Sequence, residues 1–312
     1  MTQTIGLIGP GAMGLGMTRA LLRQGFAVVA HDINPERERL AAAAGAQLAA
    51  SPAAVARQAG IVITVVVNAQ QTDEVCFGKS GLTETMQPGG VLMMCSTVAP
   101  DYTAALAARL AGHGILTLDA PISGGPARAE AGTMSMMVAG PQAAFDHCAA
   151  VLPALSDKRF VIGALPGQAS TMKLVNNLLA GIHNVAAAEA LALGLKAGLD
   201  AHKIYDVVMA SSGMSWIFGD RIKRLIEGDT QVAAAARILT KDVGLALEMA
   251  RALAFPLPLG SAAHQVFLGT LAHGHGEEDD NAVIRYYQAL TGIELPSGNA
   301  DRAATPPLTA PI

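Results

Sequence analysis

The sequence predicts an α/β fold, in which a doubly wound parallel sheet is followed by an all-helical second domain. Short apolar runs alternate with helix-like segments through the first half of the chain, and a glycine-rich motif follows the first run. After Gly167 no convincing strand pattern remains. Because 312 residues are too many for one ordinary core, we expect two domains, residues 1–163 and 164–296, and a disordered tail over residues 297–312.

Six apolar runs in the first domain have the length and composition of buried strands. They are mostly continuous in apolar character rather than alternating, which is typical of strands covered on both faces of a parallel sheet. Alanine- and leucine-rich segments between them, at 15–24, 36–44 and 103–111, suit crossover helices. The predicted strands are Thr4–Gly9, Phe26–His31, Ile61–Val67, Val91–Cys95, Ile115–Asp119 and Met134–Ala139.

The second domain reads as helices only. A long run without proline covers 173–198, and shorter helical segments follow it. The last residues contain three prolines among small polar residues, which is why we expect a disordered tail there. The shorter predicted helices are His202–Ala210, Trp216–Glu227, Lys241–Ala254, Gly260–Ala272 and Asp280–Leu290.

A Gly-x-Gly-x-x-Gly motif stands between the first predicted strand and the helix after it. In Rossmann-type domains such glycines have separate tasks: Gly9 permits a tight turn, Gly11 lets the backbone approach a pyrophosphate, and Gly14 allows close packing of helix on strand. The helix N-terminus then presents free N–H groups to the phosphates. The motif predicts dinucleotide binding.

Asp32 ends the second predicted strand, where an acidic side chain can accept hydrogen bonds from an adenosine ribose. The same carboxylate would repel a 2′-phosphate, so the sequence predicts NAD rather than NADP as the cofactor. Arg37 lies a few residues further on and could weaken this preference.

Two segments after later strands are candidates to complete the pocket. The hydroxyls of Ser96 and Thr97 follow the fourth predicted strand and could meet the nicotinamide ribose, although a helix cap before Pro100 is the alternative. The segment Ser123-Gly124-Gly125 would expose backbone N–H groups to a substrate carboxylate, the alternative being an ordinary flexible turn.

Lys173 stands early in the long helix that leaves the first domain, and Asn177 follows four residues later on the same helix face. A lysine near both ligands can act as acid or base if desolvation and the positive charge of oxidised nicotinamide lower its pKa. The alternative is an ordinary solvated lysine.

Four motifs in consistent order resemble the β-hydroxyacid dehydrogenases, the family of 3-hydroxyisobutyrate dehydrogenase and tartronate semialdehyde reductase. The likeness extends over roughly residues 4–294. Two departures, Pro10 in place of a leucine and Ile122 in place of a valine, are expected to be harmless. The motifs are Gly-x-Gly-x-Met-Gly at 9–14, Asp-Ala-Pro-Ile-Ser-Gly-Gly at 119–125, Gly-Gln-Ala-Ser-Thr-Met-Lys-Leu-Val-Asn-Asn at 167–177 and Lys-Asp-Val-Gly-Leu-Ala at 241–246.

The resemblance implies roles for individual residues. Lys173 would be the catalytic acid/base and Asn177 would orient the substrate, whose carboxylate Ser123, Gly124 and Gly125 would hold. It further implies that Thr97 contacts the cofactor, that Lys241 reaches back to it, and that the chain forms a homodimer or homotetramer. The predicted cofactor-binding set is Gly9, Gly11, Ala12, Met13, Gly14, Asp32, Asn68, Thr97 and Lys241.

The segment 211–218, together with Arg221 and 227–229, resembles the L-threonate dehydrogenase branch of this family. The polar residues Ser212, Ser215 and Trp216 could read the hydroxyls of a sugar acid, unless Trp216 only packs in the core. We therefore expect NAD-dependent oxidation of a short hydroxy acid such as L-threonate.

Three other functions stay open at the level of sequence. The first is another 3-hydroxyacid couple, as in 3-hydroxyisobutyrate dehydrogenase or tartronate semialdehyde reductase, and the second is a non-catalytic NAD-binding module. The third is a metal enzyme, suggested by His273, His275 and the acidic run 277–280, but we expect no metal there because Asp279 or Asp280 suits a helix N-cap.

Composition limits the partners and the compartment. A net charge of −4 argues against nucleic acid and allows a small anionic hydroxy acid as substrate. The three cysteines have no motif spacing, which favours buried free thiols in a reducing compartment. Without a targeting segment or an unbroken apolar run of about 18 residues, we expect no membrane contact and a cytoplasmic location. The high apolar content, 51%, favours an oligomer.

Overall fold

The computed structural model describes residues 3–296, and the chain forms two compact units that meet between Val175 and Asn176. The predicted domain boundary at residue 163 stays a prediction. The two units meet within the helix α9 (Gln168–Lys196), which begins in the first unit, where Ala169 packs on Met137 and Ala139, and continues into the second. The predicted tail, 297–312, lies outside the described residues.

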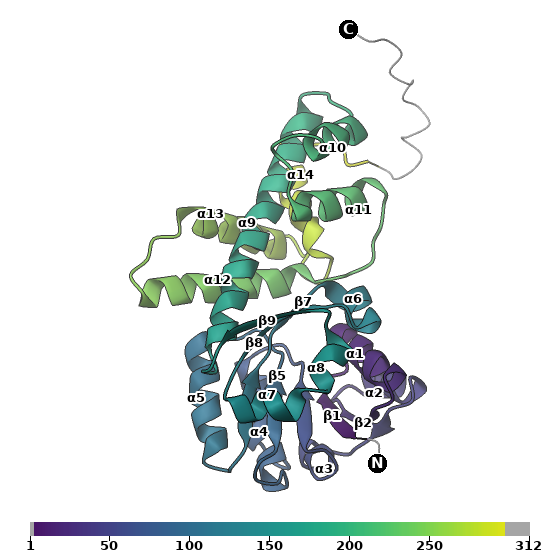
Figure 1. Ribbon diagram of the computed structural model, residues 1–312. Coiled ribbons are helices and arrows are strands. Elements are labelled where there is room, and N and C mark those ends of the chain that lie inside the picture. The colour runs from purple at the N-terminus through teal and green to yellow at the C-terminus, as the bar shows by residue number, and fades with distance from the viewer. Residues whose placement is uncertain (1–2, 297–312) are drawn as a thin grey trace. The chain divides into compact units, whose positions relative to one another are not determined.

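Within the described part of the first unit, nine strands form one sheet in the order β3-β2-β1-β4-β5-β6-β8-β7, with β9 paired to β8 (Figure 1). The strands from β3 to β6 run parallel, as predicted. The strands are β1 Thr4–Ile8, β2 Ala27–His31, β3 Gln47–Leu48, β4 Ile61–Thr64, β5 Val91–Met94, β6 Leu116–Asp119, β7 Ile122–Ser123, β8 Ser135–Ala139 and β9 Lys158–Gly163.

The far side of the sheet departs from the prediction, because β8 runs antiparallel to β6. Three strands were also missed. Two of them, β3 and β7, are only two residues long, and β9 is exposed and begins with Lys158 and Arg159, so it lacks the signature of a buried strand. The third predicted strand ends early, at Thr64, because the N–H groups of Val66 and Val67 donate to side chains rather than to a neighbouring strand.

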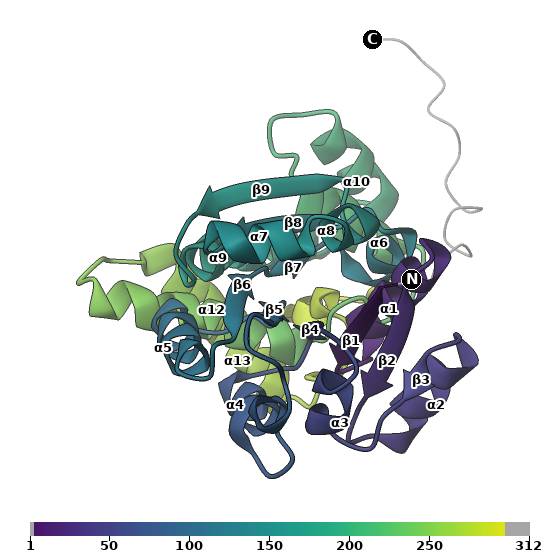
Figure 2. The same cartoon turned by 60° about the horizontal axis from the view of Figure 1, so that its bottom comes forward.

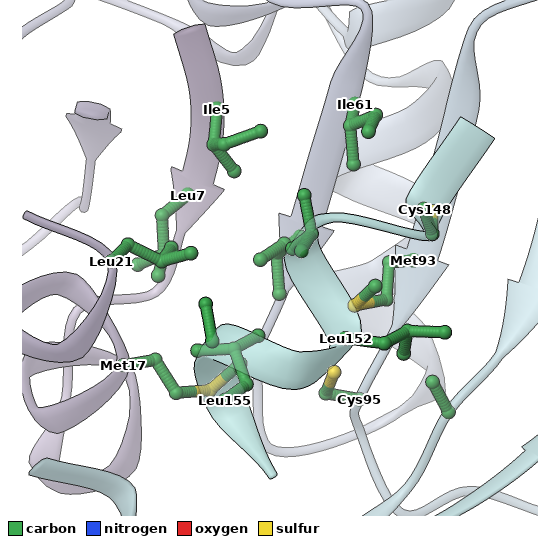
Figure 3. Close-up of a cluster of buried hydrophobic side chains, with 14 of the residues drawn as sticks. Ile5, Leu7, Met17, Leu21, Ile61, Met93, Cys95, Cys148, Leu152 and Leu155 are labelled. Carbon is green, nitrogen blue, oxygen red and sulfur yellow. The ribbon is translucent and has the colours of Figure 1, made fainter. Parts of the chain in front are cut away.

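Helices cover both faces of this sheet, as Figure 2 shows. Alternate strand residues point to opposite faces: Ile5 and Leu7 pack with α1, α6, α7 and α8, whereas Ile8 packs with α3, α4 and α5. Figure 3 shows the first of these clusters, which includes Met17 and Leu21 of α1. The helices are α1 Ala12–Arg23, α2 Pro35–Ala43, α3 Pro52–Ala56, α4 Ala69–Phe77, η1 Leu82–Glu84, α5 Pro100–Ala111, α6 Gly125–Ala131, α7 Gln142–Cys148 and α8 Val151–Leu155.

The described residues of the second unit are helical apart from one bridge between Ala235 and Asp279, as predicted. Two predicted helices are not purely α-helical: 216–227 contains a π-helical segment, and 280–290 opens with a 3₁₀ turn. The predicted helix 241–254 begins five residues earlier than expected, at Ala236. The elements after α9 are α10 Ala201–Met209, η2 Phe218–Ile222, α11 Lys223–Ile226, α12 Ala236–Ala252, α13 Pro258–Ala272, η3 Asp280–Val283 and α14 Ile284–Thr291.

The helix α9 is the core helix of the second unit. Val185, Ala188 and Leu191 lie in its hydrophobic cluster, and glycines allow close neighbours: a Cβ at Gly181 would lie 2.5 Å from Val243, and one at Gly194 would lie 2.5 Å from Ile204. By length and composition alone α9 could also span a membrane, which the sequence analysis did not anticipate. Packing in this cluster accounts for part of its apolar character, since 44% of its most apolar 18-residue window is buried.

Candidate active site

The glycine-rich loop has the geometry that its sequence predicts. Gly9 has a φ of +90°, and a Cβ at Gly14 would lie 2.2 Å from the carbonyl oxygen of Gly9, so both positions require glycine. Gly11 is the N-cap of α1, which starts at Ala12, three residues earlier than predicted. The first helical hydrogen bond runs from the Leu15 N–H to the Gly11 carbonyl, at 2.8 Å. The N–H groups of residues 12–14 therefore point out of the helix end, towards an anion.

Asp32 lies beside this loop at the end of β2. The Gly9 N–H donates to the His31 carbonyl at 3.1 Å, which places the two strand ends next to each other. Asp32 is only 8% exposed, and one of its oxygens accepts the Asn34 N–H at 2.8 Å. The other lies 3.7 Å from the Arg37 guanidinium, whose carbon is also 3.7 Å from a Cβ built on Gly11. The Arg37 guanidinium thus lies near both the Asp32 carboxylate and Gly11 of the glycine-rich loop.

The loops after β4 and β5 are joined to each other. Ser96 is buried, and its hydroxyl accepts the Val66 N–H at 3.0 Å, so this side chain holds the loops together rather than facing a ribose. The alternative of a cap is also wrong, since no side chain caps α5. Asn68 is the N-cap of α4 and accepts the Gln71 N–H at 2.9 Å. Thr97 is half-buried in the loop that follows β5.

The segment from Ser123 to Gly125 turns sharply from β7 into α6. Gly124 has a φ of +133° and Gly125 a φ of +76°, conformations that favour glycine, and the space beside Gly125 is open to 4 Å. A Cβ at Gly124 would lie 2.7 Å from the Cδ of Arg128, so the stem of this arginine covers the turn. Arg128 is not predicted from the sequence, although it is a basic residue about one helical turn after Gly124.

Asp119 ties the end of β6 to the start of α9. Its Oδ2 accepts the N–H groups of Gly167, at 2.8 Å, and Ser170, at 2.9 Å, and its Oδ1 accepts the Ser170 hydroxyl at 2.8 Å. Burial raises the pKa of the Asp119 carboxyl, and the hydrogen bonds from Ser170 and Gly167 offset only part of that effect. Asp119 is the first residue of the motif at 119–125, but the sequence alone does not predict this contact.

Lys173 follows one turn after Ser170 in α9 and is 6% exposed. A lysine is almost never this buried unless its amine has a partner, so the alternative of an ordinary solvated lysine is wrong. The amine belongs to the same unit as the glycine loop and Asp119.

In the second unit a buried carboxylate links two predicted site residues. Asp242, 3% exposed, accepts the side-chain amide of Asn177 at 2.6 Å and lies 2.7 Å from the Lys241 amine. The oxygen of the Asn177 side chain accepts the amide of Asn176 at 3.0 Å. Sequence analysis named Lys241 and Asn177 but not the aspartate that holds them, although it directly follows Lys241.

Comparison with known proteins gives the chain its family. A family model of the NAD binding domain of 6-phosphogluconate dehydrogenase matches residues 4–163, and a model described as NAD-binding of NADP-dependent 3-hydroxyisobutyrate dehydrogenase matches residues 167–287. L-threonate dehydrogenase of Cupriavidus necator is 47% identical over 95% of this chain and 99% of that protein. The chain belongs to the 3-hydroxyisobutyrate dehydrogenase-like family, in its L-threonate branch.

Other members of the 3-hydroxyisobutyrate dehydrogenase-like family agree with this placement. L-threonate dehydrogenase of Escherichia coli strain K12 is 38% identical over 95% of this chain and 97% of that protein. The crystal structure of 3-hydroxyisobutyrate dehydrogenase from Salmonella typhimurium superposes with a TM-score of 0.85 at 39% identity, covering 91% of this chain and 99% of that chain. The chain is therefore an oxidoreductase of CH–OH groups in hydroxy acids, with NAD(P) as its cofactor.

The described residues fit that cofactor. The N–H groups of the first turn of α1 are free for a pyrophosphate, Gly11 has no side chain in the way, and the Asp32 carboxylate lies at the neighbouring strand end. These features come from adjacent strands, β1 and β2, at their carboxyl ends, where ligands bind in open α/β sheets.

Ser215 and Trp216, two of the residues expected to read substrate hydroxyls, belong to the second unit. Trp216 is 59% exposed, so it is not a core residue, and with Ser215, Tyr205, Met209 and other residues it lines a cavity of about 390 Å³. This cavity adjoins α10, which packs at Gly194 of α9. Asn177 is not among the described residues that line this cavity.

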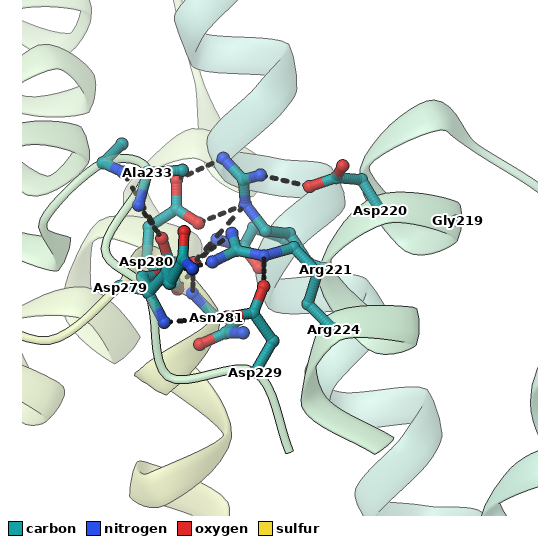
Figure 4. A network of polar contacts seen from close by, with 12 residues as sticks. Gly219, Asp220, Arg221, Arg224, Asp229, Ala233, Asp279, Asp280 and Asn281 are labelled. Carbon is teal, nitrogen blue, oxygen red and sulfur yellow. Dashed lines mark hydrogen bonds and ion pairs between the residues drawn. The ribbon is translucent and has the colours of Figure 1, made fainter. Parts of the chain in front are cut away.

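Two residues of the acidic run that suggested a metal site, Asp279 and Asp280, face arginines (Figure 4), and Glu278 of the same run bonds His275 at 2.7 Å. Asp280 pairs with Arg221, with one hydrogen bond at 3.0 Å, and Asp279 accepts from Arg224 at 3.1 Å. Asp279 is also the N-cap of η3, so the predicted cap is confirmed. The nearby carboxylates, Asp280 above all, raise the pKa of Arg221 although burial works against them. The network fixes the loop before α12 to η2 and η3.

Proposed function

We propose that this chain oxidises a short polyhydroxylated carboxylic acid, L-threonate first among the candidates, with NAD as hydride acceptor and Lys173 as general base. Full-length relatives that are 47% and 38% identical to the chain are L-threonate dehydrogenases, and this observation carries the choice of substrate. The burial of Lys173 in the unit that contains the dinucleotide loop supports its role.

The proposed roles follow from the chemistry of each group. Bound NAD would accept the hydride from the hydroxyl-bearing carbon of the substrate. The Lys173 amine would take the hydroxyl proton as the C–H bond breaks, so that the alcohol loses one hydride and one proton and becomes a carbonyl. The backbone N–H groups of Ser123, Gly124 and Gly125 would hold the carboxylate, and Asn177, oriented by Asp242, would donate to a substrate oxygen.

We assign the remaining cofactor contacts in the same way. Residues 1–163 would bind the dinucleotide through Gly9, Gly11, Ala12, Met13, Gly14, Asp32, Asn68 and Thr97, and residues 164–296 would add Lys241. The buried Asp32 carboxylate favours NAD, because it would repel a 2′-phosphate.

We further propose a cytoplasmic homodimer or homotetramer assembled through the second domain. Its described residues include apolar side chains that are largely exposed in the single chain, among them Leu193 and Val207. The three buried free cysteines are consistent with a reducing compartment.

A substrate panel tests the proposal. Purified protein would be assayed with NAD and with NADP against L-threonate, D-threonate, 3-hydroxyisobutyrate and glycerate, and in the reverse direction with tartronate semialdehyde, whose reduction gives glycerate. We expect the highest kcat/KM with L-threonate and NAD. Turnover of 3-hydroxyisobutyrate but not L-threonate would contradict the substrate, and the Salmonella structure named above makes this the second candidate.

The variant Lys173→Ala separates catalysis from cofactor binding. We expect kcat to fall at least about 100-fold, the range of general acid/base catalysis, while the Kd for NAD changes little. Lys196→Ala is a matched control, because this lysine lies on the same helix but is exposed, and its amine donates to the Thr291 carbonyl. Near-normal activity of Lys173→Ala would refute the assigned base.

A further inference from the structure

We propose that Asp119 is a positioning residue for the reaction, which sets where helix α9 begins and thereby where the amine of Lys173 stands. The inference rests on the proposed function, since it concerns the residue assigned there as general base. Asp119 belongs to the sheet and Lys173 to the helix, and the connection between them is short and buried.

The first observation is that the Asp119 carboxylate is fully hydrogen-bonded to the start of α9. The Asp119 carboxylate is fully buried and receives three hydrogen bonds between 2.8 and 2.9 Å, two from backbone N–H groups and one from the Ser170 hydroxyl. Hydrogen bonds to a charged acceptor are stronger and more directional than neutral ones. The two N–H groups belong to the start of α9, so the carboxylate satisfies donors that the helix itself leaves without a partner.

The second observation is that neighbouring contacts fix the same helix end. Gly167 has a φ of +100°, and a Cβ there would lie 2.7 Å from the Pro100 carbonyl oxygen, so the chain passes directly against the start of α5. The Thr103 hydroxyl of α5 lies 2.9 Å from the Ser170 hydroxyl, and both residues are buried. The helix end is therefore held by β6 and by α5 together.

These contacts bear on Lys173 through the geometry of a helix. Each residue turns the helix by about 100°, so a shift of one residue in the place where α9 begins would turn Lys173 a quarter of a circle or more. Ser170 stands three residues before Lys173, on nearly the same side of the helix. Because reacting groups tolerate displacements of less than about 1 Å, the end of the helix must be fixed more firmly than helix propensity alone can achieve.

A matched pair of variants tests the inference. Ser170→Ala removes the hydroxyl that donates to Asp119, and Ser156→Ala removes an equally buried hydroxyl of the same unit, which donates to the Met134 carbonyl at 2.6 Å. Each hydroxyl has two hydrogen-bond partners, Asp119 and Thr103 for Ser170, and the Met134 carbonyl and the Lys158 N–H for Ser156, so similar losses of thermal stability are expected. Asp119→Asn is the stronger variant, and Ser170→Ala keeps the test valid if that variant does not fold.

The readouts are kcat, KM for both substrates, and the kinetic isotope effect with substrate deuterated at the hydroxyl-bearing carbon. We expect Ser170→Ala to lower kcat about 10-fold and Asp119→Asn about 100-fold, with KM for NAD within twofold of the wild type and a larger isotope effect on kcat. Ser156→Ala should leave all these quantities unchanged.

Two results would overturn the inference and can be told apart. An active wild type whose Ser170→Ala and Asp119→Asn variants keep kcat and the isotope effect within twofold would refute the positioning role alone. A wild type that oxidises no hydroxy acid with NAD would refute the proposed function, and the inference with it.

Discussion

Replacing Gly14 by alanine is the sharpest test of the dinucleotide loop. A Cβ at this position would lie 2.2 Å from the carbonyl oxygen of Gly9 and 3.3 Å from Leu7. The neighbour at 2.2 Å is backbone and cannot rotate away, so the start of α1 must move by about 1 Å, and overpacking of this kind costs about 3 kcal/mol. For a chain of this size we expect Tm to fall by about 6–12 °C.

The same displacement should weaken cofactor binding. The N–H groups of residues 12–14 would move with the helix end, and losing one hydrogen bond to a charged phosphate costs about 1.5–3 kcal/mol. We therefore expect the Kd for NAD, measured by calorimetry well below Tm, to rise about 10- to 100-fold.

Gly60→Ala is the control, because a Cβ there meets no atom within 4 Å and its φ is not positive. It should leave both Tm and Kd nearly unchanged. If Gly14→Ala bound NAD within threefold of the wild type, the loop would not be the pyrophosphate site.

Three further outcomes are expected. Asp32→Ala should raise the ratio of kcat/KM with NADP to kcat/KM with NAD by about 100-fold. The variant removes a carboxylate that repels a 2′-phosphate and leaves the Arg37 guanidinium, now 3.7 Å from that carboxylate, available to the phosphate. An unchanged ratio would contradict the role of Asp32 in selecting NAD. Asp242→Asn should lower kcat about 10-fold or more, since it removes the acceptor that holds the Asn177 amide at 2.6 Å, and a normal kcat would mean that Asn177 needs no such support. The thiols of Cys76, Cys95 and Cys148 should resist a thiol reagent at pH 8 in the folded protein and react after unfolding. Burial raises the pKa of Cys76 and Cys148 to about 12 and raises that of Cys95 as well, which keeps all three thiols protonated. Rapid labelling of the native protein would argue against this.

The parts of the site that are local in sequence could be predicted without the structure. A positive φ at Gly9, the close approach at Gly14 and a helix that starts after Gly11 all arise within six consecutive residues, so their spacing alone specifies the turn. The place of Asp32 beside this loop could also be predicted, because parallel neighbouring strands bring their carboxyl ends to the same edge of the sheet. The short strands β3 and β7 could not, because two residues form no pattern.

The contacts that hold the proposed catalytic groups were decided by tertiary structure. Asp119 meets Ser170 across 51 positions, and Asn177 meets Asp242 across 65. A buried hydrogen bond needs distance and direction, which depend on the packing of whole elements, whereas a motif records only residue types and their order. The sequence could therefore name Lys173 and Asn177, but only folding determined which carboxylates lie beside Ser170 and Asn177, because nothing in the local chain selects a partner so far away.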